Sequence, residues 1–186
     1  MIALKPSKGH LLIAETSIIG DISFNRSVVL LAEHSERGSV GFILNKVLDF
    51  TLKDLIPGLN VDFQIYNGGP VEQDNLYFIH RVPDLIPDSV EIADGIYWGG
   101  NFDAVTTLIS QNMIDENQIR FFLGYSGWDA EQLNNELDSN SWIVVTNEDQ
   151  KSIIERPYDS FWKDQMMQLG GEYVLWSNAP ENPSYN

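Results

Sequence analysis

Short runs of hydrophobic residues dominate the first quarter of the chain, and their pattern predicts β-strands. Residues 10–15 and 27–34 are rich in Leu, Val and Ile and are too short for free-standing helices. Residues 39–45 form a third run after residues 35–38, in which Gly38 is suited to a positive φ. We therefore expect the second and third runs to pair as an antiparallel hairpin.

The rest of the chain mixes further apolar runs with segments that have helical spacing. Residues 61–66 read VDFQIY, an alternation typical of a half-buried strand. Asn101 stands in the N-cap position of a segment in which Val105 and Leu108 fall on one helical face. Residues 82–95 contain prolines and aspartates and are predicted as a loop or a weak edge strand. Strands are also predicted at residues 76–80, 119–124 and 142–146, and helices at residues 51–55, 102–112, 130–138, 148–154 and 157–169.

The order of these elements predicts a single α+β domain. Strands and helices do not alternate regularly, which favours a mixed sheet over a parallel α/β sheet. At 186 residues, with 43% hydrophobic and 11% aromatic content, the chain can bury a continuous core. We assign residues 1–175 to this domain and expect residues 176–186, which are polar and contain prolines, to form a flexible C-terminal tail.

The charge balance is strongly acidic and narrows the classes of partner. The chain has 11 Lys and Arg against 27 Asp and Glu, a formal net charge of -16. Such a charge repels phosphate backbones and anionic lipid surfaces, so direct nucleic-acid binding is disfavoured and no membrane partner is expected. Basic residues balance acidic ones only in the N-terminal third, which is where an anionic ligand would be expected.

The absence of cysteine excludes disulfide bonds and thiolate metal sites, and it fits a reducing compartment. The apolar run at residues 11–14 is stopped by Glu15 before it reaches the length of a signal peptide. No apolar stretch approaches the roughly 20 residues that are needed to span a bilayer. We therefore expect a soluble, cytoplasmic protein, and we expect no cofactor.

Residues 124–128, GYSGW, raise the question of whether Ser126 is a nucleophile. The nucleophile elbow of α/β hydrolases reads Gly-x-Ser-x-Gly, but Trp128 stands where its last glycine belongs. In that fold the catalytic histidine follows the serine, whereas all three histidines of this chain precede Ser126. A histidine-first order, as in other serine hydrolases, stays open.

A structural role explains more of the same residues. Asp129 is a strong N-cap for the helix that we expect to follow, and Gln132 is spaced to reach back to it in a variant of the capping box. Trp128 is spaced to pack on Leu133 as a hydrophobic staple. The two glycines of GYSGW suit a change from strand to helix, so we interpret this segment first as a structural corner.

Several short blocks of the sequence form a specific set when they occur together in order, although each is weak alone. They are Gly9 to Ala14, Phe24 to Val29, Glu33-His34, Gly38 with Gly41, Ile43-Leu44-Asn45, Gly68 to Val71, and GYSGW followed by Gln132-Leu133 and Glu136. In this order they resemble the YqgE/AlgH family of small bacterial proteins, over roughly residues 9–170. One departure is Asp129-Ala130-Glu131, where the family commonly has Gly-x-Gly.

This resemblance implies a compact α+β fold in which a mixed, mostly antiparallel sheet is partly curled into a small barrel and surrounded by helices. It implies no enzymatic activity, because the family is essentially uncharacterised. Some members are labelled as transcriptional regulators, and that label rests on genetic effects rather than on a DNA-binding motif. The acidic charge of this chain disfavours regulation by direct DNA contact.

The polar residues of these blocks are the candidates for a ligand or partner surface. Arg26 lies at the mouth of a predicted strand, where a guanidinium can bind a carboxylate or phosphate, but we favour a structural pair with a carboxylate of the chain. His34 and His80, with Glu33, would supply three metal ligands, but their spacing does not require it. We therefore assign no metal site and no catalytic residue. The candidate surface consists of Asn25, Arg26, Ser27, His34, Asn45, Tyr125, Ser126 and Trp128.

The leading interpretation is a non-enzymatic binding or regulatory protein that acts through a protein partner or a small ligand. The first alternative is a hydrolase or transferase that uses Ser126 or a histidine in a cleft. The second is a DNA-binding regulator, as the family label states. A structure tests the first alternative, since that chemistry requires Ser126 and a histidine within hydrogen-bond reach of each other.

Overall fold

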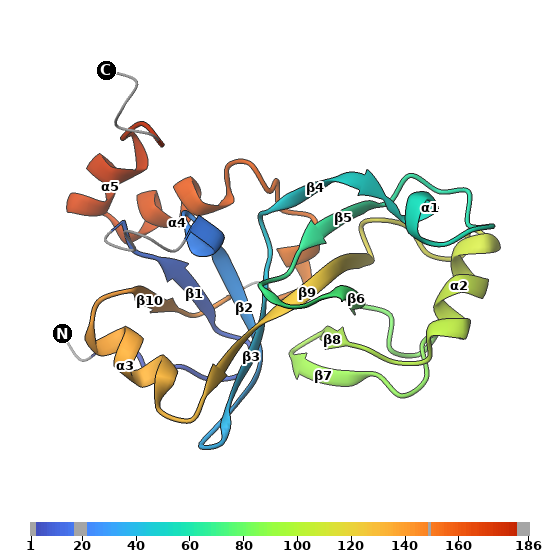
Figure 1. Cartoon of the computed structure of the whole chain (residues 1–186), viewed down its shortest axis with the longest axis horizontal. Helices are drawn as coiled ribbons and strands as arrows, with labels where there is room; N and C mark the ends of the chain where they lie inside the picture. The colour runs from blue at the N-terminus through green and yellow to red at the C-terminus, as the bar shows by residue number, and fades with distance from the viewer. Residues whose placement is uncertain (1–2, 17–21, 149, 182–186) are drawn as a thin grey trace.

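The computed structural model describes residues 3–16, 22–148 and 150–181, which form one α+β domain (Figure 1). The strands are β1 (Leu11–Ala14), β2 (Val28–Ser35), β3 (Gly38–Ile43), β4 (Val47–Thr51), β5 (Gln64–Asn67), β6 (Val71–His80), β7 (Val90–Ala93), β8 (Ile96–Trp98), β9 (Ile119–Asp129) and β10 (Trp142–Val145). The α-helices are α1 (Leu52–Leu55), α2 (Phe102–Ser110), α3 (Gln132–Asp138), α4 (Phe161–Leu169) and α5 (Glu172–Ser177), and short 3-10 helices span Ile22–Phe24 and Gln150–Ile154.

The strands form one large sheet with β9 at its centre. Along the sheet the order is β10-β1-β2-β3-β9-β6-β8-β7, and β4 and β5 form a branch beside β9. β5 runs parallel to β9, and the other strand pairs of the described residues are antiparallel. Because β9 is long, its first half pairs with β5 and β6 and its second half pairs with β3. Figure 1 shows β9 crossing the molecule from the side of α2 to the side of α3.

The predicted hairpin of β2 and β3 is confirmed. Ser35 lies opposite Gly38, whose φ of +142° is a conformation that glycine adopts readily. A side chain at Gly38 would also place its Cβ 2.5 Å from the carbonyl oxygen of Trp128 on β9. The register of the hairpin shifts between Leu31 and Glu33, so β2 carries an irregularity before it reaches the turn.

Two predicted helix starts are confirmed. The Asn101 side chain accepts a hydrogen bond of 2.9 Å from the Ala104 backbone N–H, and Val105 lies on the buried face of α2. Thr51 precedes α1, and the Asp54 carboxylate accepts a hydrogen bond of 2.8 Å from the Thr51 backbone N–H, as in a capping box. Each cap joins residues that are three apart in the sequence, which is why local sequence is enough to predict it.

The predicted strand-to-helix corner at residues 124–128 is wrong. β9 continues through this segment to Asp129, and α3 begins only at Gln132, after a residue in the left-handed conformation. Half of the predicted capping box is present, because the Gln132 side chain accepts a hydrogen bond of 3.0 Å from the Asp129 backbone N–H. Trp128 and Leu133 share a buried cluster, as the staple requires.

The glycines of this region allow two chain segments to approach closely. Gly124 lies in the middle of β9 with a φ of +72°, and the turn at residues 67–70 packs against it. A Cβ on Gly68 would lie 2.2 Å from the Gly124 carbonyl oxygen, and a Cβ on Gly69 would lie 2.2 Å from the Tyr125 carbonyl carbon. Because backbone atoms fill this space, only glycine fits at these positions. The close approach lies where β9 stops pairing with β5 and begins to pair with β3.

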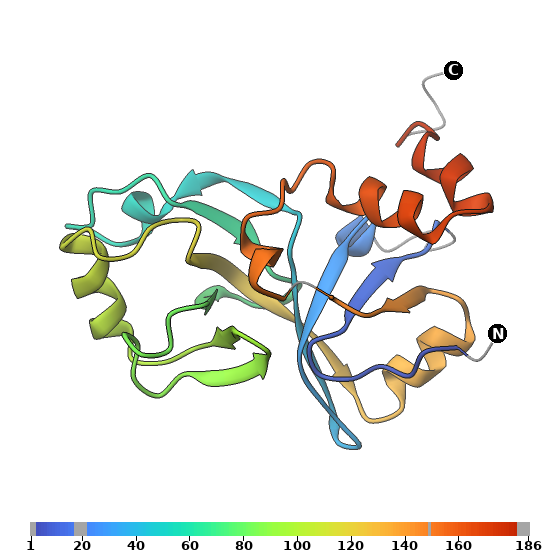
Figure 2. The same cartoon turned by 180° about the vertical axis from the view of Figure 1, so that it is seen from behind.

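The C-terminal part differs from the prediction in the type and extent of its helices. The segment predicted as a helix at residues 148–154 contains a 3-10 helix, and α4 starts later than predicted. An unpredicted helix, α5, ends at Ser177, past the domain boundary that we placed at residue 175. Residues 182–186 of the expected tail lie outside the described residues. In Figures 1 and 2, α4 and α5 lie together near the β1 end of the sheet.

The family resemblance implies that part of the sheet curls into a small barrel, and the structure shows a sheet that is not closed into a barrel. Its path ends at β10 and at β7, and no strand pairing of the described residues joins β7 to β2. β7 nevertheless contacts β2, and Gly9, before β1, packs against Ala93 of β7. The strand path is therefore open, with its β7 end close to β2.

Buried side chains fill both faces of the sheet. The central cluster includes Phe42 and Phe122, whose rings stack with centroids 5.0 Å apart, and it extends to α4. A second cluster contains the buried face of α2, and a third lies under α3. Among the described helices, none has both the length and the apolar character that crossing a membrane requires.

Candidate functional site

The loop before β2 is held by side chains that the sequence marks as surface candidates. The Asn45 side chain accepts a hydrogen bond of 2.9 Å from the Val28 backbone N–H and donates one of 2.9 Å to the Arg26 carbonyl oxygen. The hydroxyl of the buried Ser27 donates to the Phe24 carbonyl oxygen at 2.7 Å. These bonds satisfy backbone groups of the loop, so Asn45 and Ser27 shape the chain at this point.

Arg26 joins this loop to the C-terminal helices. Its guanidinium donates to the Ala179 carbonyl oxygen at 2.8 Å and lies 4.9 Å from the centre of the Trp162 ring. Neither partner is a carboxylate, so the pair favoured by the sequence is not found among the residues that the structure describes. The Lys46 ammonium donates to the carbonyl oxygen of Asn25. Four of the candidate residues therefore form one structural cluster beside α4 and α5, namely Asn25, Arg26, Ser27 and Asn45.

Ser126 is buried where β9 passes the turn at residues 67–70. Its side chain is 0% exposed, and its hydroxyl donates to the Gly68 carbonyl oxygen at 3.0 Å. Nδ1 of His34 and both ring nitrogens of His80 bond to other residues, and no described histidine is hydrogen-bonded to Ser126. The contact that the hydrolase alternative requires is therefore absent from the part of the chain that the structure describes.

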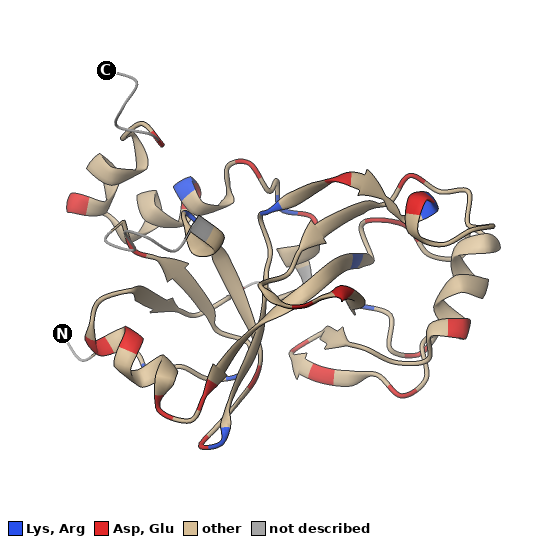
Figure 3. Cartoon of the chain, in the orientation of Figure 1, with Lys and Arg blue, Asp and Glu red and all other residues tan. Residues whose placement is uncertain are grey.

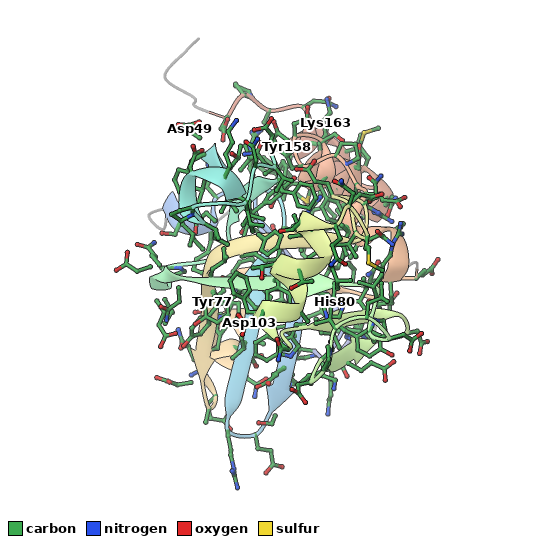
Figure 4. All side chains as sticks on the ribbon, turned by 90° about the vertical axis from the view of Figure 1, so that its right-hand side faces the viewer. Asp49, Tyr77, His80, Asp103, Tyr158 and Lys163 are labelled. Carbon is green, nitrogen blue, oxygen red and sulfur yellow. The ribbon has the colours of Figure 1, made fainter. Side chains whose placement is uncertain are left out.

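His80 is buried on β6 and makes hydrogen bonds at both ring nitrogens. Its Nε2 lies 3.1 Å from the Gly99 carbonyl oxygen and 2.9 Å from the Ser89 hydroxyl, and its Nδ1 accepts from the Val82 backbone N–H at 3.3 Å. These partners assign the proton of the neutral ring to Nε2. Burial lowers the pKa of His80, although the hydrogen bond to Gly99 acts in the opposite direction. Figure 4 shows His80 among the packed side chains at the α2 end.

The structure separates the histidines that were considered for a metal site. His34 lies in the hairpin, where its Nδ1 is 2.7 Å from the Ser39 hydroxyl, whereas His80 lies on β6 next to β8. Burial, and then the nearby His10, lower the pKa of His34. In residues 3–16, 22–148 and 150–181, no group of three or more His, Asp or Glu side chains is placed to hold a metal ion.

Three candidate residues, His34, Tyr125 and Trp128, meet at an open groove of about 760 Å³, which we name the hairpin groove. The β2–β3 hairpin and the second half of β9 form one side of it, and Val90 of β7 and Lys8 also line it. Trp128 contributes only an edge, since its side chain is 5% exposed. The other lining residues are Glu33, Ser35, Arg37, Gly38, Ser39, Val40, Val71, Gly127, Asp129 and Gln132.

Aromatic rings connect the hairpin groove to the central core. Tyr125 meets Tyr77 edge to face, with ring centroids 5.6 Å apart. Tyr77 and Trp98 lie 5.8 Å and 5.9 Å from Phe42, which belongs to the central cluster. The Trp98 indole nitrogen is buried without a hydrogen-bond partner among the described residues. A layer of aromatic rings therefore links Tyr125, which lines the groove, to the central core.

Arg120, on β9, is a buried charged residue that was not among the candidates predicted from the sequence. Its side chain is buried and donates to the carbonyl oxygens of Leu44 at 2.9 Å and Ile154 at 2.6 Å. Its guanidinium lies 4.3 Å from the centre of the Tyr66 ring. Arg120 thus joins β9 to the end of β3 and to the segment before α4. The available signal was an arginine inside the apolar run Ile-Arg-Phe-Phe-Leu.

Comparisons with known proteins identify the family. A family model described as AlgH-like matches residues 11–174. The chain belongs to the AlgH-like family. A UPF0301 protein of Chlorobium limicola is 40% identical over 179 residues, which cover 96% of this chain and 95% of the relative. A UPF0301 protein of Cytophaga hutchinsonii is 40% identical over 182 residues, which cover 97% and 99%.

Solved structures of similar proteins share the AlgH-like fold. The solution structure of the AlgH protein from Pseudomonas aeruginosa has a TM-score of 0.74 at 26% identity, over 95% of this chain and 98% of that one. A crystal structure of a protein from Corynebacterium diphtheriae has a TM-score of 0.74 at 22% identity, over 96% and 95%. The family resemblance read from the sequence is confirmed. Because the family is uncharacterised, membership establishes the fold and leaves the function to be inferred from the site.

Proposed function

We propose that this AlgH-like protein is a non-enzymatic binding protein that holds a segment of a protein partner in the hairpin groove. Its main support is that side chains from the N-terminal segment, the hairpin, β6, β7 and β9 converge on one open groove of about 760 Å³. An open groove between a hairpin and a strand edge suits an extended peptide better than a small molecule, which needs to be enclosed on most sides.

The contacts of the nucleophilic and basic side chains also support binding over catalysis. The Ser126 hydroxyl donates to a backbone carbonyl inside the protein, and the His34 ring is bonded to Ser39. A nucleophile and its general base have to contact each other and face the substrate. Ser126 and His34 each have another structural partner instead.

A regulatory role through protein contact belongs to the same proposal. Asp and Glu are spread along strands, helices and loops (Figure 3), and the net charge of -16 opposes contact with a phosphate backbone. The cytoplasm is the compartment that we propose for it, since the chain has no cysteine. Regulation in this form would change the activity of a partner protein without direct DNA binding.

A selection from a displayed library of random 12-residue peptides tests the binding role. Peptides selected on the folded chain are expected to change the NMR amide shifts of residues that line the hairpin groove. The substitution Val90→Ser is expected to lower the affinity for the selected peptides about tenfold, because Val90 is 48% exposed and lines the groove. Met113→Ser is the matched control, since Met113 is 52% exposed and lies outside the groove.

Three outcomes would contradict the proposal. The first is a set of selected peptides whose shift changes map away from the groove. The second is an equal loss of affinity in Val90→Ser and Met113→Ser. The third is a library that yields no peptide specific for the folded chain.

A further inference from the structure

Two strand edges without a strand neighbour lie next to each other at the hairpin groove. β7 pairs with β8 on one side and, among the described strands, with none on the other. β1 pairs with β2 over Val28–Leu30, and bonds from Gly9 and His10 extend this contact only to Leu31. No described strand pairs with the β1-facing edge of β2 beyond that point, at Glu33–Ser35. We name the space between β7 and this part of β2 the seam.

The seam is filled at one end and open at the other. Gly9 packs so closely against β7 that a Cβ on it would lie 2.6 Å from the Ala93 Cβ. At the opposite end, Val90 is 48% exposed and lines the hairpin groove together with Glu33 and Val40. The open end of the seam is therefore part of the hairpin groove and is accessible from solvent.

Lys8 occupies a hydrogen-bonding position on the free edge of β7. Its ammonium donates to the Glu91 carbonyl oxygen at 2.8 Å, so this carbonyl is not used by the β7–β8 ladder. An N–H group from an added strand would bond to the same oxygen. Lysine side chains commonly protect edge strands from pairing with other chains. Lys8 is exposed, so a competing backbone donor can displace its ammonium at low cost.

We propose that an extended segment of a partner protein adds to β7 as a further strand and displaces the Lys8 ammonium from the Glu91 carbonyl oxygen. This inference rests on the proposed function and specifies how the groove binds. Alternate side chains of the added strand face the apolar surface formed by Val90, Val40 and Tyr125. Its remaining side chains point to solvent at the rim of the groove.

The charges around the seam define the chemistry of the partner segment. Glu33, Asp88 and Glu91 are all exposed on or next to the strands that border it. Lys8 and Arg37 are the basic residues that line the groove, and the whole chain carries a net charge of -16. The charged lining of the groove itself is balanced, with Glu33 and Asp129 against Lys8 and Arg37, so the net charge of the chain and the exposed acids at the seam favour a basic segment. The partner segment therefore alternates apolar residues with Lys or Arg, because this pattern matches the apolar wall and these acids.

The test uses the peptide Lys-Val-Lys-Val-Lys-Val-Lys with blocked ends and the full chain. Binding is measured by calorimetry and by the NMR shifts of the β7 amides. Two further peptides carry N-methyl groups, one on the valines and one on the internal lysines. In a strand, alternate N–H groups face the same neighbour, so one methylated peptide is expected to lose about tenfold or more in affinity and the other much less. A Glu-Val peptide of the same length is expected not to bind.

Two variants of the protein test the displacement of Lys8. Lys8→Ala removes the competing donor and is expected to raise the affinity for the Lys-Val peptide severalfold. Lys5→Ala is the matched control, because it removes the same charge from an exposed position of the same segment that does not line the groove. The excess of the Lys8 effect over the Lys5 effect reports the bond to Glu91.

The outcomes separate strand addition from binding in general. Groove binding with equal effects of both methylation patterns, or with equal effects of Lys8→Ala and Lys5→Ala, overturns strand addition and leaves the proposed function standing. A Lys-Val peptide that does not bind, or that shifts residues outside the groove, also overturns it. Library peptides that map away from the groove would overturn both proposals.

Discussion

Arg120 brings a positive charge into the protein interior, where backbone carbonyls and an aromatic ring are its close partners. Leu44 and Ile154 supply the carbonyl oxygens, and the ring is that of Tyr66. Burial lowers the pKa of Arg120, and the nearby Tyr66 and Glu116 oppose this shift. The side chain holds three segments together, so its contribution to stability lies in the hydrogen bonds that it completes.

Replacement of Arg120 by methionine is expected to destabilise the protein by about 3 kcal/mol, because two buried carbonyl oxygens lose their charged donor. Chemical denaturation measures this change in the free energy of unfolding. Lys163→Met is the control, since Lys163 is exposed on α4 and labelled in Figure 4. Equal stability of the two variants would show that the Arg120 hydrogen bonds contribute little.

His80 is expected to make the stability depend on pH. Burial lowers its pKa below the ordinary value of 6.5, so the folded state binds fewer protons than the unfolded state at slightly acidic pH. The contribution is therefore complete above about pH 6.5 and is lost as the pH falls below that value. His80→Gln is expected to flatten the free energy of unfolding between about pH 7.5 and 5.5. An unchanged slope in this variant would contradict the assignment, and His34→Gln serves as the comparison at a less buried histidine.

The sequence identifies polar residues that make specific contacts, but it does not predict which groups those residues contact. Asn45 and Arg26 stand out because they are polar residues beside apolar strands, but their partners are 17 or more residues away along the chain. A single sequence does not reveal that the Asn45 side chain meets the Val28 backbone. Only the groove residues His34, Tyr125 and the edge of Trp128 remain at a shared surface.

At the scale of elements, the contact between the turn at residues 67–70 and β9 is expected to be the least tolerant of substitution. Gly68→Ala places a Cβ 2.2 Å from the Gly124 carbonyl oxygen, and neither backbone can move without breaking strand pairs. We expect a loss of about 3 kcal/mol or more, or a failure to fold.

Gly58→Ala is the matched control for this substitution. Gly58 has a φ of +94°, but a Cβ on it would meet no other part of the described chain within 4 Å, so it tests backbone strain without a clash. Its expected cost is about 1 kcal/mol. Thermal unfolding of both variants measures the difference, and a Gly68→Ala protein as stable as Gly58→Ala would contradict the close approach.

The start of α3 gives a second test at this scale. The sequence alone points to Asp129 as the N-cap, whereas in the structure the Gln132 side chain accepts the hydrogen bond from the Asp129 backbone N–H. Gln132→Ala is therefore expected to cost about 1 kcal/mol, and Asp129→Ala less, because alanine keeps the backbone donor. The reverse order of melting temperatures would restore Asp129 as the cap.

Elements that depend on neighbouring residues are predicted well, and those that depend on distant pairing are not. The β2–β3 hairpin and the Asn101 cap of α2 follow from short-range rules. β4 and β8 were missed, since three to five residues leave little periodicity to detect. The two glycines predict that β9 ends near Gly124, because glycines usually mark a turn. Its length comes instead from pairing with β3, where partners such as Gly41 and Ser126, or Gly38 and Asp129, are far apart in the chain.

At the scale of the whole molecule, the net charge of -16 sets how stability responds to salt. Mutual repulsion among carboxylates destabilises the compact state, and salt screens it. The surface ion pairs Lys53–Asp62 and Arg81–Glu155 oppose this trend, because salt also weakens attraction. Exposed pairs of this kind contribute little to stability because water and salt screen them, so repulsion among the many carboxylates is the larger effect.

The melting temperature at pH 7 is therefore expected to rise by about 3 °C when NaCl increases from roughly 20 to 300 mM, which corresponds to about 1 kcal/mol for a chain of this size. The same salt step near pH 4.3, the isoelectric point of the sequence, is the control and is expected to have little effect, since the net repulsion is gone. A melting temperature that falls with salt at pH 7 would mean that local ion pairs outweigh the net charge. In that case the acidic field would also be too weak to favour a basic partner segment at the seam.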